Sequence, residues 1–184
     1  MTNSANLHIT LDRKLDYVKH IQDKMEPDDQ IIVLEFLMYF NIFESTFFKD
    51  SGIKCYKKLE LLSKELNQET WFDIKKFNFF ANHFANRYDE KSPKGAKRYI
   101  GLHLWPGDKD YLLPALKAVI EQSEYDEKLL YYYLTIAYRF RNNLFHGEKN
   151  VEDLGNYREE FTYINQLLSW LMKDMADNNF IKKY

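Results

Sequence analysis

Cysteine, glycine and proline are scarce in this sequence of 184 residues. It has one cysteine, Cys55, together with six glycines and four prolines. One cysteine excludes an internal disulfide and a zinc site built from several cysteines, and it fits a protein of the reducing cytoplasm. The shortage of glycine and proline argues against a β-sandwich or β-barrel, because such folds need many tight turns.

The chain also lacks an excess of basic charge, since its formal net charge is −2. Any contact with nucleic acid must therefore come from a local patch. Residues 1–10 are polar and lack the apolar centre of a signal peptide. The apolar run 31–48 reaches the minimum length of a membrane span, but Glu35, Asn41 and Glu44 interrupt it. We therefore expect a buried helix, a cytoplasmic protein and no membrane partner.

Hydrophobic and aromatic residues are plentiful. They make up 45% and 17% of the chain, with 14 tyrosines and 14 phenylalanines. A chain of this length can bury a substantial core without cross-links, so residues 1–184 are expected to form a single domain with an aromatic-rich core.

Apolar residues recur every three or four positions through most of the chain, and no segment alternates with a period of two. This pattern predicts an all-α protein. The run 31–48 is apolar on nearly every side, which predicts a central helix covered by neighbours all round. The expected helices are 11–25, 31–48, a segment around 59–66, 71–88, 111–122, 129–145 and 156–175.

The longest irregular stretch expected in the chain is a loop at residues 89–110, where the helical periodicity stops. Long loops are often functional. Its basic residues either contact phosphate groups or simply face solvent, and the sequence leaves both alternatives open. The interrupting residues are Pro93, Gly95, Gly101, Pro106 and Gly107, and the basic ones are Lys91, Lys94, Lys97 and Arg98.

Residues suited to phosphate chemistry gather in the segment 138–149, YRFRNNLFHGEK. Histidine suits proton transfer because its ordinary pKa, about 6.5, lies near neutral pH. Arginine suits a phosphate because its planar, permanently charged guanidinium donates two parallel hydrogen bonds. Arg141 and His146 could therefore perform part of a metal-independent RNA cleavage, in which a 2′-hydroxyl loses a proton and a 5′-oxygen gains one.

Helical geometry leaves open which arginine contacts the phosphate. On an ideal helix Arg141 and His146 lie about 140° apart, so they share a face only if the helix ends between them. Gly147 makes such an ending plausible. Arg139, Asn142 and His146 lie within a stripe of about 60°. Arg139 is therefore a rival to Arg141.

Glu44 lies in the helix that we expect to be most buried. A lone carboxylate is costly there unless a cation accompanies it. Arg141 is the natural partner, although another base or solvent would also serve. No His, Asp or Glu group has the spacing of a catalytic metal site, and no glycine-rich phosphate loop is present. We expect no metal and no cofactor.

The segment RNNLFHG, residues 141–147, resembles the signature of the HEPN superfamily of helical ribonucleases, in which an arginine precedes a histidine by four to six residues. Phe40, Phe43 and Glu44, followed by Lys49, are similar to a second pattern of bacterial HEPN proteins. The chain departs at Glu148, where many relatives have another glycine, and this could alter the loop that carries the histidine.

This resemblance implies a HEPN-like helical bundle that forms a homodimer, with two signatures facing each other across the interface. It implies metal-independent RNA cleavage by Arg141 and His146, as a toxin or an antiviral-defence effector that an antitoxin or another regulatory protein could control. Asn142 and Glu44 would orient the catalytic pair, with Arg139 in support. Lys149, Lys94, Lys97 and Arg98 would hold the RNA backbone. The alternative is a non-catalytic helical module that binds a nucleotide, RNA or a protein through the same face.

Overall fold

The computed structural model describes residues 25–48, 53–145 and 151–183, and this part of the chain is all-α. The predicted all-α class is therefore confirmed for these residues. The α-helices are α2 (Pro27–Phe47), α3 (Cys55–Asn67), α4 (Asn78–Arg87), α5 (Pro93–Ile100), α6 (Leu112–Gln122), α7 (Leu129–Phe145) and α8 (Arg158–Asp177). The 3-10 helices are η1 (Ile74–Phe77), η2 (Val151–Tyr157) and η3 (Phe180–Lys183). The expected helix 11–25 lies outside the described residues, apart from its last residue.

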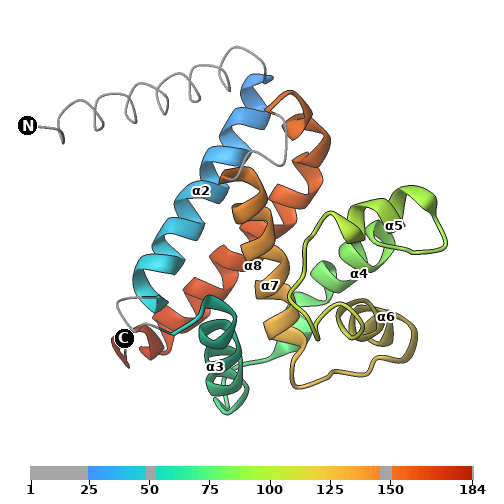
Figure 1. Cartoon of the computed structure of the whole chain (residues 1–184). Coiled ribbons are helices and arrows are strands. Elements are labelled where there is room, and N and C mark those ends of the chain that lie inside the picture. The colour runs from blue at the N-terminus through green and yellow to red at the C-terminus, as the bar shows by residue number, and fades with distance from the viewer. Residues whose placement is uncertain (1–24, 49–52, 146–150, 184) are drawn as a thin grey trace, which may run out of the picture.

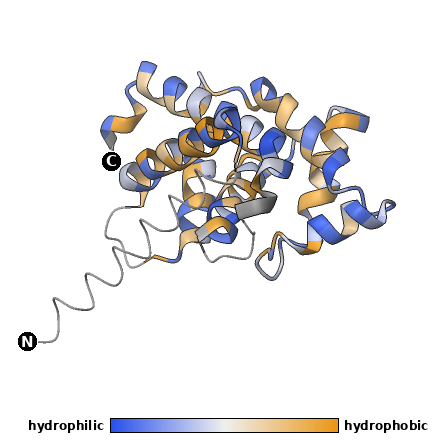
Figure 2. Cartoon of the chain, turned by 90° about the horizontal axis from the view of Figure 1, so that it is seen from above, coloured by the Kyte–Doolittle hydropathy of each residue, from blue (hydrophilic) through white to orange (hydrophobic). Residues whose placement is uncertain are grey.

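The helices pack around one hydrophobic core. α2 lies along α8, α3 packs against α7, and α4 contacts both α6 and α8 (Figure 1). α5 lies beside α4, at the side of the molecule opposite α2. Most helices carry both hydrophobic and hydrophilic residues, as expected for amphipathic elements around a shared core (Figure 2).

The central helix is α7 rather than α2. Every residue from Leu129 to Ala137 is buried, so this part of α7 is covered on all sides. Its sequence there, LLYYYLTIA, carries no charge and can be buried without desolvating an ionised group. Helix α2 carries Glu35 and Glu44 within its apolar run, and these charges favour a helix at the edge of the core.

Only one face of α2 is buried, so the prediction that it is covered all round is wrong. The buried face carries Val33, Phe36, Phe40, Phe43 and Phe47. A second stripe at helical spacing is between 47% and 56% exposed, and it consists of Ile31, Leu34, Met38 and Ile42. We call these four residues the α2 stripe.

By length and composition alone, α2 could also cross a membrane, and no other described helix passes this test. The core helices of soluble proteins can pass it too. The expected absence of a membrane partner stays a prediction.

The predicted loop at 89–110 is wrong in its middle, because residues Pro93–Ile100 form α5. Ser92 caps this helix, since its side-chain oxygen accepts a hydrogen bond from the Gly95 amide at 3.3 Å. Pro93 is pre-organised for the first helical turn, where no amide hydrogen is required. Gly95 allows a close approach, because a Cβ there would collide with the backbone of Asp89. Both residues had suggested a loop. Pro93 instead starts a helix, and Gly95 allows a close packing contact.

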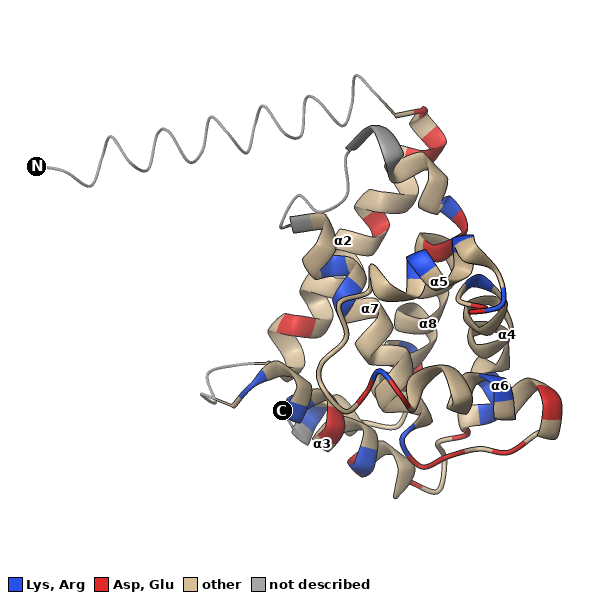
Figure 3. Ribbon diagram, turned by 45° about the vertical axis from the view of Figure 1, so that its right-hand side comes forward, with Lys and Arg blue, Asp and Glu red and all other residues tan. Residues whose placement is uncertain are grey.

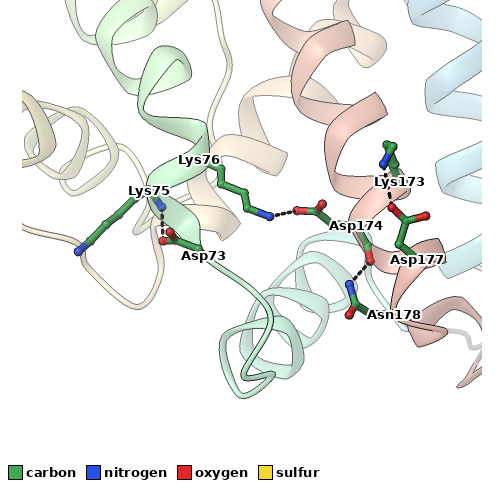
Figure 4. A network of polar contacts seen from close by, with 7 residues as sticks. All are labelled: Asp73, Lys75, Lys76, Lys173, Asp174, Asp177 and Asn178. Atoms are coloured by element: carbon green, nitrogen blue, oxygen red, sulfur yellow. Dashed lines mark hydrogen bonds and ion pairs between the residues drawn. The ribbon is translucent and has the colours of Figure 1, made fainter.

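The expected helix 71–88 also begins later than predicted. Asp73 accepts a hydrogen bond from the Lys75 amide and thereby starts η1. Helix α4 follows at Asn78. An exposed ion pair of 2.9 Å between Lys76 and Asp174 connects η1 to α8 (Figure 4). Exposed pairs of this kind stabilise a fold by about 0–1 kcal/mol, so packing rather than charge holds η1 in place.

His83 on α4 stacks on Tyr163 of α8, with ring centroids 4.1 Å apart and planes 21° apart. The pKa of His83 is lowered to about 4, mainly by desolvation. The negative charge of Glu159 acts in the opposite direction and raises it. His83 is therefore neutral in the folded protein at neutral pH.

We expect His83 to make the protein less stable as the pH falls from about 6.5 to about 4. Between these values the unfolded chain holds a proton on this ring and the folded chain does not, so acid favours unfolding. After discounting for partial exposure, the loss should be on the order of 1–2 kcal/mol. Urea unfolding at about pH 7 and about pH 5 should show a smaller pH dependence for His83→Phe than for wild type. Equal pH dependence in both proteins would contradict this assignment.

Candidate functional site

The end of α7 meets α2 through an ion pair between Arg141 and Glu44. The Arg141 Nη2 atom donates to the Glu44 Oε2 atom at 3.0 Å. Its Nη1 atom donates to the side-chain oxygen of Asn142 at 3.2 Å. The predicted pairing of Glu44 with Arg141 is confirmed, and Asn142 contacts the same guanidinium.

This pair is partly exposed, so the expectation of a deeply buried Glu44 is wrong. The side chains of Arg141 and Glu44 are 29% and 28% exposed. The reason is that Glu44 lies beside the buried face of α2 and not within it. A pocket of about 280 Å³ opens here, lined by Leu37, Phe40, Asn41, Glu44 and Arg141. A ligand in this pocket would therefore reach a guanidinium that is already oriented.

Arg139 has a different partner from Arg141. Its guanidinium carbon lies 4.2 Å from the centre of the Trp105 ring, which in turn stacks on Tyr138 at 5.4 Å. The pKa of Arg139 is lowered, mainly because the side chain is partly buried. Because its guanidinium is already stacked and partly desolvated, Arg139 is less accessible to a phosphate than its spacing predicted.

Cys55 lies near the same pair at the start of α3. Burial is the largest influence on the pKa of its thiol and raises it to about 11, while a hydrogen bond with Tyr138 opposes the shift. The thiol is therefore protonated at neutral pH and is a poor nucleophile.

Two of the predicted site residues, His146 and Lys149, lie outside the described residues. The described end of α7 is held to α5 by Asn143, whose side-chain amide donates to the Gly101 carbonyl at 2.9 Å.

A second and larger cavity lies between α4, α5, α7, η2 and α8, and we call it the basic cavity. Its volume is about 740 Å³. It brings together Lys94, Lys97 and Arg98, three of the residues predicted to bind RNA. Figure 3 shows basic positions of α5 beside α4. The lining residues used below are Arg87, Tyr88, His103, Asn143, Tyr157 and Glu160.

Arg87 and Glu160 also line this cavity, and sequence reasoning missed Glu160. Arg87 of α4 forms an ion pair with Glu160 of α8, which is 1% exposed. Arg87 also donates from its Nη2 atom to the Asn156 carbonyl at 3.2 Å. The only sequence signal for a buried charge at Glu160 is its place next to the apolar stripe of α8, in the segment REEFTYI (158–164).

The two pockets have separate linings. Arg141 lines the smaller pocket, whereas Lys94, Lys97 and Arg98 line the basic cavity. The predicted site is thus divided between two sides of α7. Within the described ranges, no group of three or more His, Cys, Asp and Glu side chains could hold a metal ion.

Comparison of the chain with protein-family models, with curated proteins and with solved structures finds no match. The likeness to the HEPN superfamily therefore depends on the sequence motifs alone.

Proposed function

We propose that this chain is a HEPN-like helical domain and a metal-independent endoribonuclease, which acts as a toxin or an antiviral-defence effector. Arg141 and His146 of two protomers form a composite site. Arg141 stabilises the negative charge on the phosphorus centre, and His146 transfers protons. Glu44 and Asn142 position Arg141.

The observation that carries this proposal is the oriented, partly exposed guanidinium of Arg141. Glu44 and Asn142 hold two of its nitrogens, at 3.0 and 3.2 Å, while the side chain remains 29% exposed. A positioned cation stabilises a transition state better than a mobile one, because it needs no reorganisation during the reaction.

The α2 stripe supports the homodimer. Its four apolar residues lie at helical spacing on one helix and keep about half of their surface exposed, which favours contact with another apolar surface. Leu37, Asn41 and Glu44 of the same helix line the Arg141 pocket. A second copy packed on α2 would therefore lie next to Arg141.

Cleavage of total RNA by the purified protein in excess EDTA tests the proposal. Wild type should cleave, and Arg141→Ala and His146→Ala should each be slower by about 100-fold or more. Arg139→Ala should remain close to wild type, which separates the two rival arginines. Cleavage that survives in both Arg141→Ala and His146→Ala would overturn the site assignment. No cleavage by folded wild type would favour the non-catalytic binding module.

The dimer is tested with Met38→Asp in the α2 stripe. We expect this variant to be a folded monomer by light scattering and to have lost cleavage. Leu61→Asp on α3 is the matched control, since Leu61 is 48% exposed but lies on another helix. A dimeric, active Met38→Asp variant would contradict an interface on α2.

A further inference from the structure

The basic cavity concentrates positive charge on one wall. Among the described residues, four cations, Arg87, Lys94, Lys97 and Arg98, line it together with a single carboxylate, Glu160. Arg87 already compensates that carboxylate through the buried ion pair. The three cations of α5 therefore remain as an excess, in a chain whose net charge is −2.

The lining carries a buried hydroxyl, that of Tyr88. The Tyr88 side chain is 2% exposed, and its oxygen has no hydrogen-bond partner among the described residues. Leaving a buried polar group unsatisfied costs about 1–3 kcal/mol, so such groups call for an explanation. Burial raises the pKa of Tyr88 well above its usual range, so the hydroxyl keeps its proton and can donate.

The backbone of the lining is also unusual at His103. This residue has a φ of 50°, in the left-handed region that non-glycine residues seldom adopt. Such conformations are concentrated at sites that hold ligands. His103 lies just beyond the end of α5, so the same segment carries the cations and the strained residue.

We propose that the basic cavity binds the terminal phosphate of a nucleotide, either as a free mononucleotide or as the phosphorylated end of an RNA strand. Lys94, Lys97 and Arg98 hold the phosphate, and Tyr88 donates a hydrogen bond to it. The nucleoside lies along Tyr157 and Asn143. This binding does not depend on cleavage at Arg141, which lines a different pocket.

A terminal phosphate fits these observations better than an internal phosphodiester does. A phosphomonoester carries a charge between about −1.5 and −2 at neutral pH, so it favours cations that converge on one point. A run of phosphodiesters favours cations spread along a track. Helix α5 has only eight residues, and its basic side chains line one cavity. The volume of about 740 Å³ lies within the range of small-molecule sites.

Calorimetric titration of the full chain tests the proposal with defined probes. The probes are adenosine 5′-monophosphate, adenosine, inorganic phosphate, and a 2′-O-methyl RNA oligonucleotide with or without a terminal phosphate. The 2′-O-methyl groups remove the nucleophile of RNA cleavage, so the result is independent of any ribonuclease activity. We expect binding of the phosphorylated nucleotide or oligonucleotide, and at least about tenfold weaker binding of adenosine and of inorganic phosphate.

The variants separate the cavity from general electrostatics. Lys97→Ala and Arg98→Ala should each weaken binding by about tenfold, since each removes a charged hydrogen bond. Lys91→Ala removes the same charge nearby but does not line the cavity, so it should bind as wild type does. Tyr88→Phe should weaken nucleotide binding without lowering the melting temperature. Removal of a hydroxyl with a purely structural role would not give this combination of results.

Each result separates one interpretation from another. Tight binding of the mononucleotide identifies a free nucleotide as the ligand, and binding of the phosphorylated oligonucleotide alone identifies an RNA terminus. Equal binding of both oligonucleotides would overturn the proposal in favour of an internal backbone track. Equal binding of inorganic phosphate and the mononucleotide, or no binding of any phosphorylated probe, would also overturn it.

Discussion

Replacing Arg87 by methionine should lower the free energy of unfolding by about 3–5 kcal/mol. The substitution leaves Glu160, which is 1% exposed, without its cation in the interior between α4 and α8. Removing the direct partner of a buried charge costs this much because the remaining charge is poorly solvated. It also removes the hydrogen bond from Arg87 to the Asn156 carbonyl. Urea unfolding followed by circular dichroism measures the effect.

The double variant Arg87→Met, Glu160→Leu is the control for this prediction. It removes both charges and keeps apolar volume at both positions, so most of the lost stability should return. A double variant as unstable as Arg87→Met alone would mean that the loss comes from packing. A change below about 1 kcal/mol in Arg87→Met would mean that Glu160 has access to another cation or to water.

Exchanging the two charges of the Arg141 pair should separate structural from catalytic roles. In the variant Glu44→Arg, Arg141→Glu the ion pair can re-form with reversed polarity. Because the pair is partly exposed, stability should change by no more than about 1 kcal/mol. RNA cleavage should fall by about 100-fold to 1,000-fold, since a carboxylate then faces the phosphate. The single variant Glu44→Gln should be intermediate, because it keeps the cation but weakens its positioning.

The remote pair Lys173 and Asp177 on α8 offers a matched control. These side chains form an exposed ion pair of 2.8 Å (Figure 4). Exchange of their charges should leave both stability and cleavage near wild type. Full cleavage by the exchanged Glu44 and Arg141 variant would show that Arg141 does not contact the phosphate. Both rates and melting temperatures are needed to distinguish this result from unfolding.

The two proposed sites would give this chain separate surfaces for chemistry and for recognition. The Arg141 pocket lies against α2, while the basic cavity lies on the side of α7 that faces α4, α5 and α8. Asn143 connects the two regions, because it belongs to α7 beside Arg141 and binds the carbonyl that follows α5. Because the two pockets share no lining residue, loss of nucleotide binding and loss of cleavage can be measured independently in the variants above.

The sequence was sufficient for the fold class and for most helix positions. Three- and four-residue spacing of apolar side chains reports which face of a segment is buried, and this local signal identified 129–145 as a helix with the bounds that the structure has. The sequence also predicted Arg141 as the partner of Glu44, 97 residues away, although the deep burial of Glu44 from which that prediction started is wrong. The catalytic role of Arg141 and His146 remains a prediction.

The tertiary structure decided what local spacing cannot express. Hydropathy made α2 the central helix, but neighbours cover only one of its faces and enclose the uncharged part of α7 instead. Pro93 and Gly95 suggest a loop until Ser92 is seen as a cap and Asp89 as a close neighbour. The basic cavity combines Arg87, α5 and Glu160, and their meeting depends on how three helices pack. A sequence determines which side chains prefer burial, whereas the packing of distant segments determines which of them are buried together.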